Sequence, residues 1–253
     1  MVVPDHMTML GQRKEAHEMS RRQLLPAVLL ALAVSIATPA LAAKPPTTWD
    51  GLMQVKSKRF DLVYLAPGAT FSGYTKVMLA PTEVAFHKTW RRDYNTQGGG
   101  LSRDVSEKDV QKAIAEGVAA AEDIFGEEFA KGGYPVVTEP GADVLLVRTG
   151  VLNIRLSAPD TFEAGRTYTF ANDAGEATYF MEVRDSATGA LLGRAVDRDL
   201  AGDNTVGRRN RATNRSDFRR LVQRWAELSV RGLSELKARA PIDDAGQFAG
   251  KAP

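Results

Sequence analysis

Residues 178–199, TYFMEVRDSATGALLGRAVDRD, decide the fold class of this chain. Two runs with strand character, 178–184 and 190–199, flank the segment DSATG at 185–189. Asp, Ser, Thr and Gly are residues that tight turns favour. The stretch therefore predicts an antiparallel β-hairpin.

Several segments before the hairpin also have strand character. Residues 60–65 and 74–79 are short and largely apolar, and a proline follows each within two residues. Residues 83–90 are apolar at alternate places. Residues 144–147 are continuously apolar, as in a strand covered on both faces, and alternation over 152–156 predicts that this strand emerges half exposed.

Two amphipathic helices complete the pattern. The first begins after Ser106, a favoured N-cap, and Asp109 three residues on comes close to a capping box. The second begins near Asn214 or Ser216 and ends before Pro241. Apolar residues recur every three or four positions on both: Val110, Ile114, Val118, Ala121, Phe125 and Phe129, then Phe218, Leu221, Val222, Trp225, Leu228, Leu233 and Leu236.

The order of strands, helix, strands and helix predicts the α+β class. We expect a single domain in which a mostly antiparallel sheet carries two main helices on one face. Residues 1–42 are expected to be an N-terminal extension with a signal peptide, residues 43–240 the folded domain, and residues 241–253 a flexible tail.

The start of the chain has the pattern of a bacterial export signal. Arg21-Arg22 precede an apolar run at 24–37, and A-x-A at 40–42 predicts cleavage after Ala42. This run has 14 residues, whereas a spanning helix needs about 20, so cleavage is favoured over a permanent anchor. The arginine pair fits the general secretory route, which we favour, and also the twin-arginine route. Met19 is an alternative start.

Composition excludes several classes of protein. Removing residues 1–42 takes away four basic and three acidic residues, which leaves 211 residues with a net charge of +1 and no pull toward nucleic acid. Cysteine is absent, so the chain has no disulfide and no thiolate site. His87 is the only histidine of the mature chain, which excludes a multi-histidine zinc site. We expect no metal and no cofactor.

Six arginines within thirteen residues form the sharpest local charge feature. One hypothesis is an anion-binding surface for lipid headgroups, lipopolysaccharide phosphates or wall carboxylates. The favoured interpretation is a solvated loop that leads into the last helix, with Asp203 and Asp217 partly neutralising it. The six are Arg208, Arg209, Arg211, Arg215, Arg219 and Arg220.

The hairpin also carries an acidic cluster. With its tip at residues 187–188, Glu176 pairs with Asp199, and Asp197 lies two residues away on the same face, whereas Arg198 faces the other side. Such carboxylates can act as acid and base in glycoside hydrolysis or bind calcium. Ordinary charge pairing at a solvated strand end is the favoured interpretation. Carboxylates that prove to be splayed apart or salt-bridged would remove the hydrolase hypothesis.

The chain resembles a family of bacterial envelope proteins, known as domain of unknown function thirty-three thirteen, over about residues 49–237. Members are typically predicted lipoproteins, and the family has no established activity or site residues. This chain has no cysteine after its signal, so a soluble periplasmic form is expected. The landmarks are WDGL at 49–52, 60–68 with Tyr74, Ala80-Pro81 with Phe86 and Trp90, PGADVL at 140–145, RDS at 184–186 with Thr188-Gly189, and Trp225-Ala226.

From these observations we expect an exported protein of the periplasm and not an enzyme. Its role would be to bind, support or assemble another envelope component, whether protein, lipid or glycan. Peripheral association with a membrane is compatible with that role. The alternative is a carboxylate-dependent hydrolase of envelope glycans that uses Glu176, Asp197 or Asp199. No nucleophile or nucleotide-binding motif supports another reaction.

Overall fold

A computed structural model describes residues 44–97, 104–156, 169–209 and 211–249. Of residues 97, 169–172, 203–209 and 211 only the backbone is described. The predicted signal peptide lies outside these ranges. Within them, no helix has the length and apolar character that crossing a membrane requires.

Eight strands of the described residues form one sheet in the order β1-β2-β3-β8-β7-β6-β4, and β5 also pairs with β6. Only β4 and β5 run parallel to β6, and every other pair is antiparallel. The predicted antiparallel sheet is therefore confirmed. The strands are β1 (Thr48–Trp49), β2 (Leu52–Val55), β3 (Leu62–Leu65), β4 (Lys76–Leu79), β5 (Glu83–Phe86), β6 (Val144–Leu156), β7 (Thr169–Asp185) and β8 (Leu191–Arg209).

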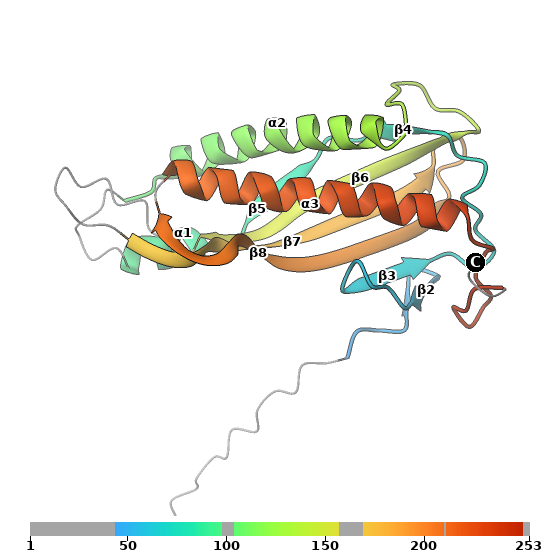
Figure 1. Ribbon diagram of the computed structural model, residues 1–253, viewed down its shortest axis with the longest axis horizontal. Coiled ribbons are helices and arrows are strands. Elements are labelled where there is room, and N and C mark those ends of the chain that lie inside the picture. The colour runs from blue at the N-terminus through green and yellow to red at the C-terminus, as the bar shows by residue number, and fades with distance from the viewer. Residues whose placement is uncertain (1–43, 98–103, 157–168, 210, 250–253) are drawn as a thin grey trace, which may run out of the picture. The chain divides into compact units, whose positions relative to one another are not determined.

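Two long helices, α2 (Glu107–Lys131) and α3 (Arg211–Lys237), lie side by side over one face of the sheet (Figure 1). This arrangement confirms the α+β class and the helix placement. A third helix, α1 (Trp90–Gln97), was not predicted. Trp90 begins this helix instead of ending a strand, and its ring stacks on Phe86 with centroids 4.6 Å apart.

Aromatic rings fill the centre of the core between the helices and the sheet. Tyr179 of β7 lies between Phe125 of α2 and Trp225 of α3, with ring centroids 5.8 and 5.4 Å away and interplanar angles of 15°. Phe60 approaches the same tyrosine at 5.9 Å. The Tyr179 hydroxyl and the Ser229 Oγ share a hydrogen bond of 2.8 Å, so the buried ring keeps a polar partner. This cluster joins both long helices to the sheet.

The first amphipathic helix has the predicted bounds and cap. Ser106 Oγ accepts a hydrogen bond from the Asp109 amide, and Asp109 Oδ2 accepts one from the Ser106 amide, so the capping box is complete. The helix ends at Lys131, directly before the predicted Gly-Gly stop.

Three boundaries differ from the prediction. Strand β7 begins at residue 169 and β8 continues to residue 209, so the hairpin is much longer than expected. Helix α3 begins at Arg211, a few residues before the predicted start. The tail was predicted to be flexible, but Ile242 is buried, bridges Phe248 and accepts a hydrogen bond from the Gly68 amide. Residues 241–249 therefore belong to the folded domain.

We predict that Ser106→Ala lowers the free energy of unfolding by about 1 kcal/mol, because it removes the N-cap acceptor of α2. Urea unfolding followed by circular dichroism measures the change. Ser106→Asn keeps an acceptor and should cost clearly less. An equal loss for both variants would show that the cap contributes nothing at this helix.

Candidate functional site

The predicted register of the β7–β8 hairpin is wrong beyond its tip. Arg184 pairs with Leu191, as predicted, but Val183 pairs with Gly193, so Leu192 is an extra residue in β8. This β-bulge shifts the pairs from Val183 with Gly193 to Gly175 with Ala201 by one residue, and a shift of one residue moves a side chain to the opposite face. The acidic cluster predicted on one face is therefore divided between two.

Asp197 and Asp199 face the helices. Asp197 Oδ2 accepts a hydrogen bond of 2.8 Å from Trp225 Nε1, and its Oδ1 accepts one of 3.0 Å from the Asp61 amide. Asp199 Oδ2 accepts a hydrogen bond of 2.6 Å from Arg224 Nη2. Burial raises the pKa of the Asp197 carboxyl above its usual value, and the two hydrogen bonds offset only part of that effect. Both aspartates thus attach α3 to the sheet.

Glu176 lies on the opposite face. Its register partner is Leu200, and Arg198 donates from Nε at 3.2 Å and also from Nη2 to Glu176 Oε2. Arg155 Nε lies 3.7 Å from Glu176 Oε1, and Arg155 Nη2 lies 2.8 Å from His87 Nε2. Arg198 thus shares the face of Glu176. His87 contacts Arg155 through Nε2 and shares a hydrogen bond of 3.0 Å with the hydroxyl of its near neighbour Thr89 through Nδ1. Across the described residues, no three His, Asp or Glu side chains are grouped to hold a metal.

The predicted arginine loop is regular structure. Arg208 and Arg209 are strand residues that pair with Phe170 and Thr169, and Arg211 is the first residue of α3. The side chains of these three arginines lie outside the described part. The loop prediction was wrong because strand β8 continues to Arg209, ten residues beyond the predicted end of the strand at residue 199.

The other three arginines lie on the first turns of α3. Arg215 forms an ion pair with Glu116 of α2, and Arg220 pairs with the buried Asp217 of its own helix. Arg219 is exposed. Two of these three side chains are therefore bound to carboxylates, which weakens them as anion ligands.

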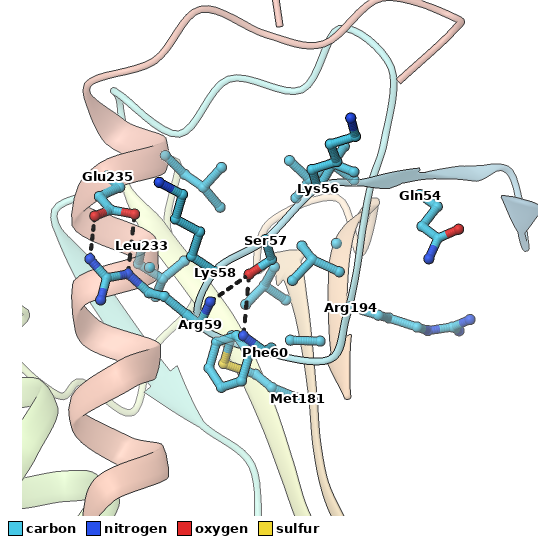
Figure 2. Close-up of a pocket in the computed structure, with 18 of the residues that line it drawn as sticks. Gln54, Lys56, Ser57, Lys58, Arg59, Phe60, Met181, Arg194, Leu233 and Glu235 are labelled. Atoms are coloured by element: carbon cyan, nitrogen blue, oxygen red, sulfur yellow. Dashed lines mark hydrogen bonds and ion pairs between the residues drawn. The ribbon is translucent and has the colours of Figure 1, made fainter. Parts of the chain in front are cut away.

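A groove of about 1200 Å³ opens at the other end of α3 (Figure 2). Its walls are the loop between β2 and β3, the last turns of α3 and Phe248 of the C-terminal segment. The floor consists of aliphatic side chains from strands β2, β3 and β7 and from helix α3, which are distant from one another in the sequence. These are Val55, Val63, Leu65, Met181, Val183, Leu233 and Leu236.

Hydrogen bonds and an ion pair fix the loop at the rim of this groove. Ser57 Oγ accepts from the amides of Arg59 at 3.0 Å and Phe60 at 3.2 Å. Arg59 forms a bidentate ion pair with Glu235 of α3, donating from Nε to Oε2 at 3.1 Å and from Nη2 to Oε1. The Arg59 guanidinium holds the pKa of the Glu235 carboxyl below its usual value. The loop is therefore attached to the helix across the groove.

The rim is cationic. Lys56 and Lys58 are exposed on either side of Ser57, and the described residues offer neither of them a carboxylate partner in a salt bridge. Arg239 covers the Phe248 ring, with its guanidinium carbon 4.8 Å from the ring centroid. Sequence analysis missed this site. The stretch KSKR at 56–59 was an available signal, but nothing in the sequence places it over an apolar floor.

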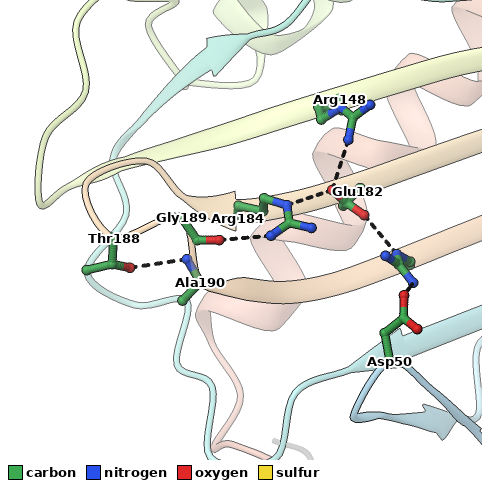
Figure 3. Close-up of polar contacts among 8 residues, drawn as sticks. Asp50, Arg148, Glu182, Arg184, Thr188, Gly189 and Ala190 are labelled. Atoms are coloured by element: carbon green, nitrogen blue, oxygen red, sulfur yellow. Dashed lines mark hydrogen bonds and ion pairs between the residues drawn. The ribbon is translucent and has the colours of Figure 1, made fainter.

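A second polar cluster lies on the sheet face away from the helices (Figure 3). Glu182 is only 3% exposed and accepts hydrogen bonds from Arg184 Nε at 2.7 Å and Arg194 Nε at 2.8 Å, with Arg148 at 3.5 Å. Arg194 also pairs with Asp50 at 2.7 Å. Burial alone would raise the pKa of Glu182, but the arginine hydrogen bonds outweigh burial and hold the pKa below its usual value. The cluster connects β6, β7 and β8 to the β1–β2 turn.

Comparison with known protein families shows the family to which this chain belongs. The sequence profile of a family described as "Protein of unknown function (DUF3313)" matches residues 46–229. The chain belongs to this family. The resemblance seen in the sequence landmarks is thereby confirmed. No curated protein sequence matches this member.

Solved structures show limited similarity to this DUF3313 member. A PelC dodecamer from Paraburkholderia phytofirmans is 14% identical, with 66% of this chain and 94% of that chain covered and a TM-score of 0.33. A minor lipoprotein from Acinetobacter baumannii is 10% identical, with 64% and 93% covered and a TM-score of 0.29. A DUF330 protein from Xanthomonas campestris is 10% identical, with 66% and 90% covered and a TM-score of 0.30.

We predict that Glu182→Gln lowers the free energy of unfolding at pH 7 by about 2 kcal/mol, because it removes the charged acceptor that Arg184 and Arg194 share and leaves Asp50 as the remaining carboxylate on Arg194. The folded pKa of Glu182 lies below its unfolded value of about 4.3. The advantage of the wild type is therefore complete above that unfolded value and is lost as the pH falls through the folded pKa. Urea unfolding at a series of pH values measures both effects.

The matched control is Glu122→Gln, because Glu122 lies exposed on α2 and loses the same charge. We expect it to change stability by less than about 0.5 kcal/mol. A loss for Glu182→Gln no larger than the control, or one independent of pH, would contradict a stabilising role for the cluster.

Proposed function

We propose that this chain is exported to the bacterial cell envelope and acts there as a non-catalytic binding protein. The export pattern in residues 19–42 and the family of envelope proteins that the chain resembles support this location. The ligand would be an envelope component that the groove at the end of α3 accommodates.

The observation that carries this proposal is the composition of the groove. Lysine side chains without carboxylate partners among the described residues line a rim above an aliphatic floor. Ligand sites commonly combine an apolar lining with a few placed polar groups. The two acidic residues at the groove are engaged already, since Glu235 pairs with Arg59 and Asp61 accepts from the Arg198 amide. The groove is therefore suited to holding a ligand.

The hydrolase alternative has less support. Glycoside hydrolysis needs two carboxyl groups that flank one bond. Glu176 lies on the opposite face of the sheet from Asp197 and Asp199, and each of these side chains accepts a hydrogen bond from a tryptophan or an arginine. None of the three lines the groove.

Native mass spectrometry of protein extracted from the periplasm of its own host tests the proposal. We expect a mass that begins at Ala43 with an envelope component bound non-covalently. Asp199→Asn and Glu176→Gln should carry the same component to the same extent, because a binding protein does not need these carboxylates.

Two results would contradict the proposal. An uncleaved mass found outside the envelope would refute export. An intact ligand that accumulates only on the Asp199→Asn or Glu176→Gln protein would indicate a disabled hydrolase that holds its substrate.

A further inference from the structure

We propose that the groove binds a single-chain anionic amphiphile, with an acyl chain on the aliphatic floor and a phosphate or carboxylate at Lys56 and Lys58. This inference rests on the proposed binding function and names the ligand class. It follows from three properties of the groove: its floor, its rim and the fixed geometry of the loop between them.

The floor favours an aliphatic chain. Val63 and Leu236 are the partly exposed aliphatic side chains of the floor, and Leu65, Met181, Val183 and Leu233 are among its buried ones. Together they offer no donor, and only the weak thioether acceptor of methionine. A glycan would leave its hydroxyl groups without partners there, which is costly. Each methylene of an acyl chain that becomes buried is worth about fourfold in affinity. A volume of about 1200 Å³ is ample for a ligand of this size.

The rim favours a negative charge. Five cations, Lys56, Lys58, Arg59, Arg194 and Arg239, and two carboxylates, Asp61 and Glu235, line the groove. Arg194 is paired with Glu182 and Asp50, which lie outside the lining. The Arg59–Glu235 ion pair compensates one charge of each sign. The excess positive charge therefore lies on the lysine pair and Arg239, at the mouth of an apolar groove. An amphiphile with an anionic head is complementary to both parts at once.

The loop is held in place before any ligand binds. Ser57 Oγ caps the amides of Arg59 and Phe60, the Arg59 side chain is attached to α3, and the Phe60 ring packs against Tyr179. Figure 2 shows the two lysine side chains extending from this loop on either side of Ser57. Such preorganisation of the loop lowers the entropic cost of presenting the two lysines to a ligand.

Calorimetry on the mature protein, with amphiphiles below their micellar concentrations, tests the inference. Myristoyl-lysophosphatidylglycerol is the anionic probe, myristoyl-lysophosphatidylcholine has the same chain with a zwitterionic head, and inorganic phosphate has the charge without the chain. We expect the anionic lysolipid to bind at least tenfold more tightly than the other two. Lys56→Gln/Lys58→Gln should weaken its binding by about 20- to 30-fold, because each lysine near an anionic head contributes about fivefold.

Two further variants separate the floor from the rim. Lys88→Gln/Lys108→Gln removes the same charge from exposed positions away from the groove and should leave binding unchanged. Phe248→Ala should weaken both lysolipids about equally, because it alters the wall and leaves the lysine pair in place.

Equal affinity for the two lysolipids would overturn the inference, as would phosphate binding as tight as the anionic lysolipid, or no binding at all. A glycan or protein found on the extracted native protein would overturn the lipid inference and leave the binding function standing. Cytoplasmic protein that still prefers the anionic lysolipid would refute the envelope function and leave the groove chemistry standing.

Discussion

The stack of Trp225 on Tyr179 is the interaction on which the rest of this structure depends. Both rings are fully buried, and they join the middle of α3 to the middle of β7. The indole Nε1 also donates to Asp197 of β8, so one side chain fixes the helix over two neighbouring strands. Phe125 on the other side of Tyr179 places α2 beside α3. Aromatic side chains bury large areas and add a preference for stacked geometry, which explains why they occupy this junction.

The position of α3 over β7 and β8 has consequences on both sides of the helix. Asp197 and Asp199 lie beneath it and become structural acceptors, although their sequence pattern resembles a catalytic pair. Strands β2 and β3 lie beyond β8 in the sheet, where the β2–β3 loop and the C-terminal segment form the cover. The groove follows from this incomplete coverage. Its aliphatic floor combines Leu233 and Leu236 from the last turns of α3 with strand residues such as Val63.

Short sequence patterns predicted the features that depend on residues close together in the chain. The Ser106 cap, the two apolar stripes and the turn after β7 are all visible in short windows, and each was found. The hairpin register was not predicted correctly. Gly193, an isolated glycine in a strand pattern beside the bulged Leu192, was an available signal for that irregularity. The groove was missed because Leu65, Met181 and Leu233 meet only in the folded chain. By contrast, Asp50-Gly51, with positive φ at both residues, is a two-residue turn signal present in the sequence itself.

A double-mutant cycle with Trp225→Phe and Asp197→Ala tests most directly whether the helix-face carboxylate is structural. A hydrogen bond to a charged group contributes about 1.5–3 kcal/mol. If Asp197 holds α3 through the indole, urea unfolding at pH 7 should give a coupling energy of about 2 kcal/mol, and each single variant should be less stable than the wild type. Additive effects, with an Asp197→Ala protein as stable as the wild type or more so, would contradict this account. Such a result would point to a carboxylate retained for chemistry at the expense of stability.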